Sequence, residues 1–216
     1  LTEESHRKWL EWRRHRVEGE SGLLAVPAEV PDEDAAPPDF NLGFTYGTVH
    51  CSALDSHGNL SGVTSTSGLS FRLPGRTADS AIIGAGLFVD NEVGAAGATG
   101  RGEAAIKICG AHTVVEGLRR GLAPVEACLE ALRRVVEHTV EPRLLRKDGR
   151  PNFNLTFYAL AKDGRYGAAT LWSGREFAVH IDGRSRRAEC AFLFERAEGR
   201  ASLPAALARK ANSDGP

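Results

Sequence analysis

The sequence predicts an α+β fold in which an antiparallel sheet is covered by helices. The first reason is the order of the elements: strand patterns, then two helical patterns, then strand patterns again. The second reason is the distribution of glycine, because 12 of the 24 glycines lie within residues 43–102. Such density indicates tight turns and places where backbones approach each other closely.

The N-terminal segment is predicted to be a helix followed by a linker. In residues 2–17, Trp9 and Trp12 share one side of a charged stretch at helical spacing. Residues 18–41 combine several prolines with acidic side chains, a composition typical of an exposed connecting segment. The composition changes near Asn41, where the folded part of the chain is expected to begin.

A β-hairpin is expected next. Residues 48–54 and 60–66 are β-compatible, and residues 55–59 between them form a cluster of turn-forming types. A further short strand is predicted at residues 69–73.

Two helices and a second group of strands follow. Residues 103–120 carry apolar side chains at helical positions and end in Arg119-Arg120-Gly121, which indicates a helix terminus. Pro124 opens a second helix that runs through Val136, since proline is well suited to the first helical position. The strands predicted after the helices are residues 153–160, 166–171, 176–181 and 187–195, with Asp182-Gly183 as a hairpin turn.

The composition excludes several classes of function. The 216 residues include 27 Lys and Arg against 28 Asp and Glu, so the net charge of -1 offers no bulk field for nucleic acid. No stretch reaches the roughly 20 apolar residues that a membrane span requires. The four cysteines lack a C-x-x-C motif and the seven histidines are scattered, so no metal site is expected.

The cellular compartment stays open. The chain starts at Leu1 and contains no methionine, so we expect it to be processed or a fragment. No signal-peptide pattern is visible at Leu1. The protein is therefore expected to be cytoplasmic, or periplasmic, secreted or lysosomal if an upstream signal existed.

Polar residues with chemical potential gather in the glycine-rich window. Arg76 and Asp79 would present a cation and an anion to one zwitterionic ligand such as an α-amino acid, although their spacing alone favours a surface ion pair. Thr99 and Gly100 offer a hydroxyl and an unhindered N–H that would suit an oxyanion hole, or would form an ordinary loop. The complete set is Thr48, Thr64, Thr66, Arg76, Asp79, Thr99 and Gly100.

Four blocks in this window resemble the N-terminal-nucleophile (Ntn) asparaginase family, and within it the glycosylasparaginases. The resemblance extends through the two helices and the following strands, over most of residues 42–181. It depends on the order and spacing of the blocks more than on any single one. They are Gly47-Thr48-Val49 with Gly62–Gly68, Gly75–Ser80, Gly84–Asn91 and Gly94–Glu103.

The resemblance implies an architecture and a maturation step. It implies a four-layer αββα sandwich, of which the N-terminal part is missing from this chain. Residues 1–47 would be the C-terminal part of the family's α-chain, and residues 48–216 the catalytic β-chain, with a frayed tail from about residue 205. Cleavage of the Gly47–Thr48 bond would separate the two, and the αβ units would pair into dimers.

The resemblance also assigns roles. Thr48 would be the nucleophile, its freed α-amino group would act as the base, and Thr66 would hydrogen-bond its hydroxyl. An α-amino pKa of about 7.7–8.0 suits work near neutrality. Arg76 would hold the carboxylate of a small-molecule substrate and Asp79 its α-amino group. Thr99 and Gly100 would stabilise the oxyanion, and the reaction would need no cofactor.

Three readings of the function follow. The first is hydrolysis of the side-chain amide of N4-glycosylated asparagine. The second is isoaspartyl peptidase or L-asparaginase activity, because Gly47 stands before the threonine where glycosylasparaginases usually have Asp. The third is a non-catalytic relative, because His50 stands where the family usually has glycine and because the 47 residues before Thr48 are fewer than the family's α-chain has. Residues two apart on a strand share a face, so the ring would lie on the side of Thr48.

Overall fold

A computed structural model describes residues 47–68 and 75–196, together with residues 3–4, 6–7 and 9–10 near the N-terminus. These few N-terminal residues are helical, as expected for the segment 2–17. The linker at 18–41, the short strand predicted at 69–73 and the tail from 205 lie outside the described residues.

The centre of the fold is a five-stranded sheet. Its neighbouring strands pair in the order β3-β4-β5-β6-β9, and all pairs are antiparallel except β6 with β9. The prediction of an antiparallel sheet is therefore wrong for that last pair. The strands are β3 (Leu87–Asp90), β4 (Gly94–Gly100), β5 (Leu155–Ala161), β6 (Tyr166–Trp172) and β9 (Ala191–Phe194).

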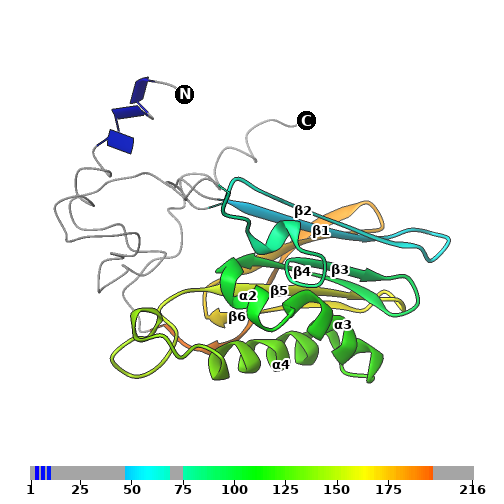
Figure 1. Ribbon diagram of the computed structural model, residues 1–216. Helices are drawn as coiled ribbons and strands as arrows, with labels where there is room; N and C mark the ends of the chain where they lie inside the picture. Colours follow the sequence, from blue (N-terminus) through cyan, green and yellow to red (C-terminus); the bar gives the residue numbers. More distant parts are fainter. Residues whose placement is uncertain (1–2, 5, 8, 11–46, 69–74, 197–216) are drawn as a thin grey trace.

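The α-helices α2, α3 and α4 lie between β4 and β5 in the chain, and α3 and α4 cover one face of this sheet (Figure 1). The core between them is made mostly of small and aliphatic side chains, and Phe157 of β5 is fully buried in it. Gly110 lets α3 approach this ring, because a Cβ there would lie 2.4 Å from the ring. The helices are α2 (Gly102–Lys107), α3 (Gly110–Arg119) and α4 (Pro124–Glu137).

The opposite face of the sheet is covered by a β-hairpin of β1 (Thr48–Leu54) and β2 (Leu60–Thr66), which lies above β3 and β4 in Figure 1. Both strands have the predicted bounds and pair antiparallel. Alternate residues of the hairpin are half-buried against the sheet and the others are exposed. The described residues thus form a helical layer, a sheet and a hairpin, which confirms the α+β fold.

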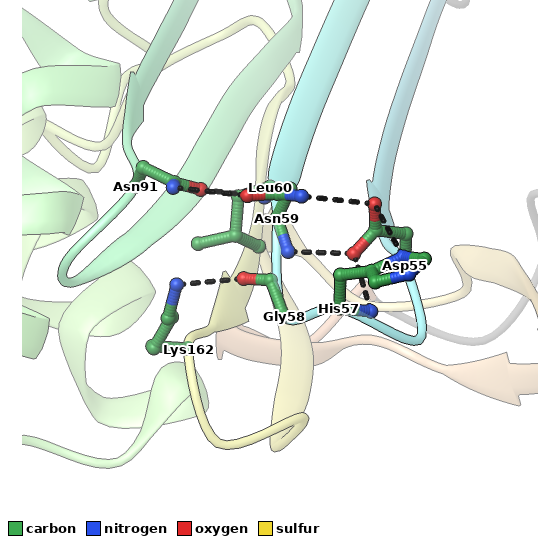
Figure 2. A network of polar contacts seen from close by, with 7 residues as sticks. All are labelled: Asp55, His57, Gly58, Asn59, Leu60, Asn91 and Lys162. Carbon is green, nitrogen blue, oxygen red and sulfur yellow. Dashed lines mark hydrogen bonds and ion pairs between the residues drawn. The ribbon is translucent and has the colours of Figure 1, made fainter.

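The distal end of this hairpin is fastened by polar contacts to two turns of the sheet (Figure 2). The Asp55 carboxylate accepts hydrogen bonds from the N–H groups of His57 and Asn59 and holds the β1–β2 turn. The Leu60 N–H donates to Asn91 Oδ1 at 2.7 Å, and Lys162 Nζ donates to the Gly58 carbonyl at 2.6 Å. The hairpin is therefore fixed at the end opposite Thr48.

The structure departs from the predicted elements in the middle of the chain. The helix predicted at 103–120 is divided into α2 and α3 at Cys109, whose φ of 47° interrupts the helix. Strands β3 and β4 were not predicted. Strand β4 consists of glycine, alanine and one threonine, so it lacks the alternation of apolar and polar side chains that predicts a strand.

The C-terminal strands also differ in part. The run predicted at 187–195 is divided at Cys190, which follows β8 (Arg184–Glu189) and precedes β9. The Cys190 N–H donates to the Arg175 carbonyl at that point. The predicted Asp182-Gly183 turn does join β7 (Glu176–Ile181) to β8.

Candidate functional site

The first group of site residues lies where β1 begins beside the end of β2. Thr48 and Thr66 face each other across the hairpin. The Thr48 hydroxyl donates to Thr66 Oγ1 at 3.0 Å, and the Thr66 hydroxyl donates to the Gly47 carbonyl at 3.2 Å. Thr66 Oγ1 also accepts the Gly68 N–H at 2.9 Å. The Thr66 hydroxyl thus donates one hydrogen bond and accepts two, which is its full capacity. These three bonds fix its orientation beside Thr48.

His50 lies on the same face of β1 as Thr48 and fills the gap between the hairpin and the sheet. Its ring lies against Gly97 of β4, where a Cβ would come within 2.0 Å of Nδ1. Nδ1 is 3.0 Å from Thr64 Oγ1 and Nε2 is 2.8 Å from Ser52 Oγ. Burial lowers the pKa of His50 to about 4, so the ring is neutral near pH 7.

The tautomer of His50 follows from its partners. Thr64 gives its own proton to the Gly86 carbonyl, so Thr64 Oγ1 accepts from Nδ1–H and the bare Nε2 accepts from Ser52. Both ring nitrogens are engaged by hydroxyls of the hairpin, those of Thr64 and Ser52. The ring therefore fits against Gly97 of the sheet, and the Thr48 hydroxyl keeps its hydrogen bond to Thr66.

Thr99 lies near the end of β4 and is half-buried on the sheet face that the hairpin covers. Its Oγ1 is 2.9 Å from the hydroxyl of Tyr158 on β5. The Tyr158 ring stacks on His50 with centroids 5.7 Å apart and an interplanar angle of 20°. Sequence reasoning missed Tyr158; the strand predicted at residues 153–160 includes it but indicates no partner for its hydroxyl.

Gly100 ends β4 in a conformation that disfavours other residues. Its φ is 114°, and a Cβ would lie 2.5 Å from the Asn154 carbonyl. The chain then turns into α2, with the Arg101 N–H donating to that same carbonyl at 3.0 Å. Glycine is thus needed for both backbone angle and space, which the glycine-rich sequence predicted only in general terms.

The second group of site residues is charged and surrounds the start of α2. Arg76 donates through Nε and Nη2 to one oxygen of Glu103, with the Nε contact at 3.1 Å. Arg101 Nε lies 3.5 Å from the other oxygen of Glu103. Burial raises the pKa of Glu103, but the hydrogen bond from Arg76 and further favourable contacts lower it by more. Glu103 thus carries a charge that two guanidinium groups share.

Asp79 lies beside this group and is only 5% exposed. It begins the short helix η1 (Asp79–Ala81), and its Oδ1 occupies the space that a Cβ on Gly102 would need, at 2.3 Å. Oδ2 is buried without a hydrogen-bond partner among the described residues. Burial raises the pKa of Asp79, outweighing the Ser80 N–H and the Arg76 charge, which lower it. A cationic ligand group would satisfy this oxygen and lower the pKa.

The predicted site residues thus form two groups. Gly47, Thr48 and Thr66 are linked by hydrogen bonds. Arg76 and Asp79 lie together around the start of α2. This helix begins at Gly102, shortly after Thr99 and Gly100 at the end of β4. The groups are connected by the packing of β1 on β4, with the His50 ring at the contact.

No cluster of three histidine, cysteine or acidic side chains among the described residues has the proximity needed for a metal ion. Of the described helices, none combines the length and apolar character needed to span a membrane.

Comparison with known proteins gives a consistent result. A family model described as Asparaginase matches residues 1–142. The N(4)-(beta-N-acetylglucosaminyl)-L-asparaginase of Elizabethkingia miricola is 39% identical over 191 residues, 88% of this chain and 48% of that protein. A Drosophila yakuba protein that carries the same name provisionally is 33% identical over 185 residues, 78% of this chain and 44% of that protein.

A further relative has a different name. The L-asparaginase-like protein of Drosophila pseudoobscura pseudoobscura is 36% identical over 133 residues, which is 62% of this chain and 26% of that protein. The chain spans about half the length, or less, of these curated relatives.

Proposed function

Since the chain belongs to the asparaginase family, whose model matches residues 1–142, we propose that it provides the catalytic part of an amidohydrolase with Thr48 as nucleophile. The observation that carries the proposal is the hydrogen-bonded group of Thr48, Thr66 and Gly47 at the start of β1. A threonine hydroxyl is a weak nucleophile until a base removes its proton. The α-amino group of Thr48 would be that base once the Gly47–Thr48 bond is cleaved.

The same group suits self-cleavage. The Thr66 hydroxyl donates a hydrogen bond to the Gly47 carbonyl, the group that would be attacked. This hydrogen bond polarises the carbonyl. Attack by Thr48 Oγ1 on this carbonyl would transfer the acyl group from nitrogen to oxygen, and water would then release Gly47 as a carboxylate. The product would be a chain with Thr48 at its N-terminus.

The charged group suits the amino-acid part of a substrate. The Arg76 guanidinium would bind the α-carboxylate, and the unpaired Oδ2 of Asp79 would accept from the α-ammonium group. Thr48 Oγ1 would then attack the side-chain amide carbonyl, and Thr99 and the Gly100 N–H would stabilise the oxyanion. Expulsion of the amine would leave a β-aspartyl ester on Thr48, which water would hydrolyse.

The substrate proposed first is N4-glycosylated asparagine, supported by the name of the Elizabethkingia miricola relative. The second candidate is a β-aspartyl peptide or free asparagine. It is favoured by Gly47 before the nucleophile, where the glycosylasparaginases usually have Asp, and by the L-asparaginase-like relative. The two candidates share one acyl-enzyme and differ only in the leaving group.

Intact mass and N-terminal sequencing of the complete gene product test the nucleophile. The wild type is expected as two chains, one beginning at Thr48, whereas Thr48→Ala is expected as a single chain. Ser65→Ala, on the exposed face of β2, is the matched control and should be cleaved like the wild type. Uncut wild-type protein would contradict the proposal and favour a non-catalytic relative. Cleaved protein should then be assayed with glycosyl-asparagine, β-aspartyl dipeptides and asparagine.

A further inference from the structure

We propose that Tyr158 is a positioning residue that orients the hydroxyl of Thr99 toward the oxyanion. This inference rests on the proposed function and extends it to a residue that no motif identified. Tyr158 does not itself reach the reacting atoms in this proposal; it acts through Thr99.

The register of β4 and β5 brings the two residues together. Gly97 is paired with Tyr158, and Thr99 is paired with Thr156. All four side-chain positions therefore lie on the sheet face toward the hairpin, while Ala96, Ala98 and Phe157 face the helices. Because Gly97 has no side chain, the tyrosine hydroxyl reaches diagonally to Thr99 Oγ1, at 2.9 Å.

The direction of this hydrogen bond decides what Thr99 can do. A threonine hydroxyl has one proton, and to stabilise an oxyanion it must donate that proton to the substrate. Thr99 Oγ1 must then accept from Tyr158. Burial raises the pKa of Tyr158, although the Thr99 contact lowers it, so the phenol keeps its proton and remains a donor. The bond thus frees the Thr99 proton for the substrate.

The tyrosine ring is held so that it cannot turn away from Thr99. It stacks on the His50 ring with the two centroids 5.7 Å apart, and this stack fixes the plane of the tyrosine ring. The His50 ring is in turn fixed by Thr64 and Ser52 and by the surface of Gly97. A donor fixed before the reaction stabilises a developing charge without the cost of reorientation.

The test is a double-variant cycle on turnover, using Tyr158→Phe, Thr99→Ala and the two combined. Tyr166→Phe is the matched control, because Tyr166 lies on β6 and its hydroxyl contacts Arg186 instead. The assay uses processed protein and whichever of glycosyl-asparagine, β-aspartyl dipeptide or asparagine the wild type hydrolyses. Phenylalanine keeps the ring and its stack, and circular dichroism verifies the fold.

Tyr158→Phe is expected to lower kcat about tenfold with KM within about twofold, since the loss arises only in the transition state. In the Thr99→Ala background the same change should have no further effect on kcat. In Thr99→Ser, whose hydroxyl rotates more freely, it should cost more than in the wild type. Tyr166→Phe should leave kcat unchanged.

Unchanged kcat in Tyr158→Phe would overturn the inference, as would an equal loss in the presence and absence of the Thr99 hydroxyl. In both cases wild-type turnover would leave the proposed function standing. Processed wild-type protein that hydrolyses none of the three substrates would overturn both, since Thr99 would then have no oxyanion to serve.

Discussion

Gly97→Ala should destabilise the protein by about 2–5 kcal/mol, although alanine at a strand position normally costs nothing relative to glycine. The added Cβ would lie 2.0 Å from Nδ1 of His50, 2.2 Å from Cε1 and 2.4 Å from Cγ. Carbon contacts are relaxed at about 3.5–4.0 Å, so the ring would have to move by more than an ångström. It is held by Thr64 at 3.0 Å and Ser52 at 2.8 Å, so one or both bonds would break. Overpacking adds about 1–3 kcal/mol and each lost bond about 1 kcal/mol.

Urea unfolding followed by circular dichroism measures this cost. His50→Ala alone should also destabilise, because it removes a packed ring and takes one hydrogen-bond partner from each of the Thr64 and Ser52 hydroxyls. The double variant should be nearly as stable as His50→Ala, since the new methyl then has room. The coupling between the two changes should exceed about 1 kcal/mol. A loss below about 0.5 kcal/mol in Gly97→Ala, or additive losses in the double variant, would refute the reasoning.

Three further predictions follow from the charges and burial of single residues. Because burial lowers the pKa of His50 to about 4, the unfolded chain binds more protons below pH 6.5, and stability should fall as the pH drops from 6.5 toward 4. The loss in the free energy of unfolding should approach about 3 kcal/mol, at 1.36 kcal/mol per pKa unit. If stability fell equally steeply between pH 6.5 and 5 in His50→Asn, this prediction would be contradicted. Glu103→Gln should raise KM several-fold with little change in kcat, because Arg76 loses its anionic partner and its fixed orientation. A fall in kcat without a rise in KM in steady-state assays would count against this. In mass-spectrometric alkylation of native protein, Cys51, which is exposed, should be labelled, whereas the buried Cys128, whose pKa burial raises, should resist until denaturant is added.

The hairpin and the later helix were predictable because their signals are local. The turn residues 55–59 and the flanking β-compatible runs specified β1 and β2 to the residue. Pro124 fixed the start of α4. In contrast, β4 has almost no side-chain pattern, since its residues are small on both faces and its place between β3 and β5 is a tertiary effect. The interruption at Cys109 likewise depends on how α2 and α3 pack.

The site was predictable only as far as its motifs reached. The blocks around Thr48, Arg76 and Thr99 named the candidate residues, and the structure supplies the partners that orient them. Glu103 belongs to the same sequence block as Thr99, yet only the fold shows it on Arg76. Tyr158 is 59 residues from Thr99 in sequence, and the strand register alone brings them together.

His50 shows why a departure from a family pattern must be judged in three dimensions. In sequence, a histidine two residues after Thr48, the proposed nucleophile, argued for a non-catalytic relative. In the structure, the ring occupies space that the missing side chain of Gly97 leaves open, and both nitrogens are paired with hairpin hydroxyls. A large residue on β1 and the smallest residue on β4 therefore compensate each other. The departure is then no argument against catalysis, and it creates the surface on which Tyr158 stacks beside Thr99.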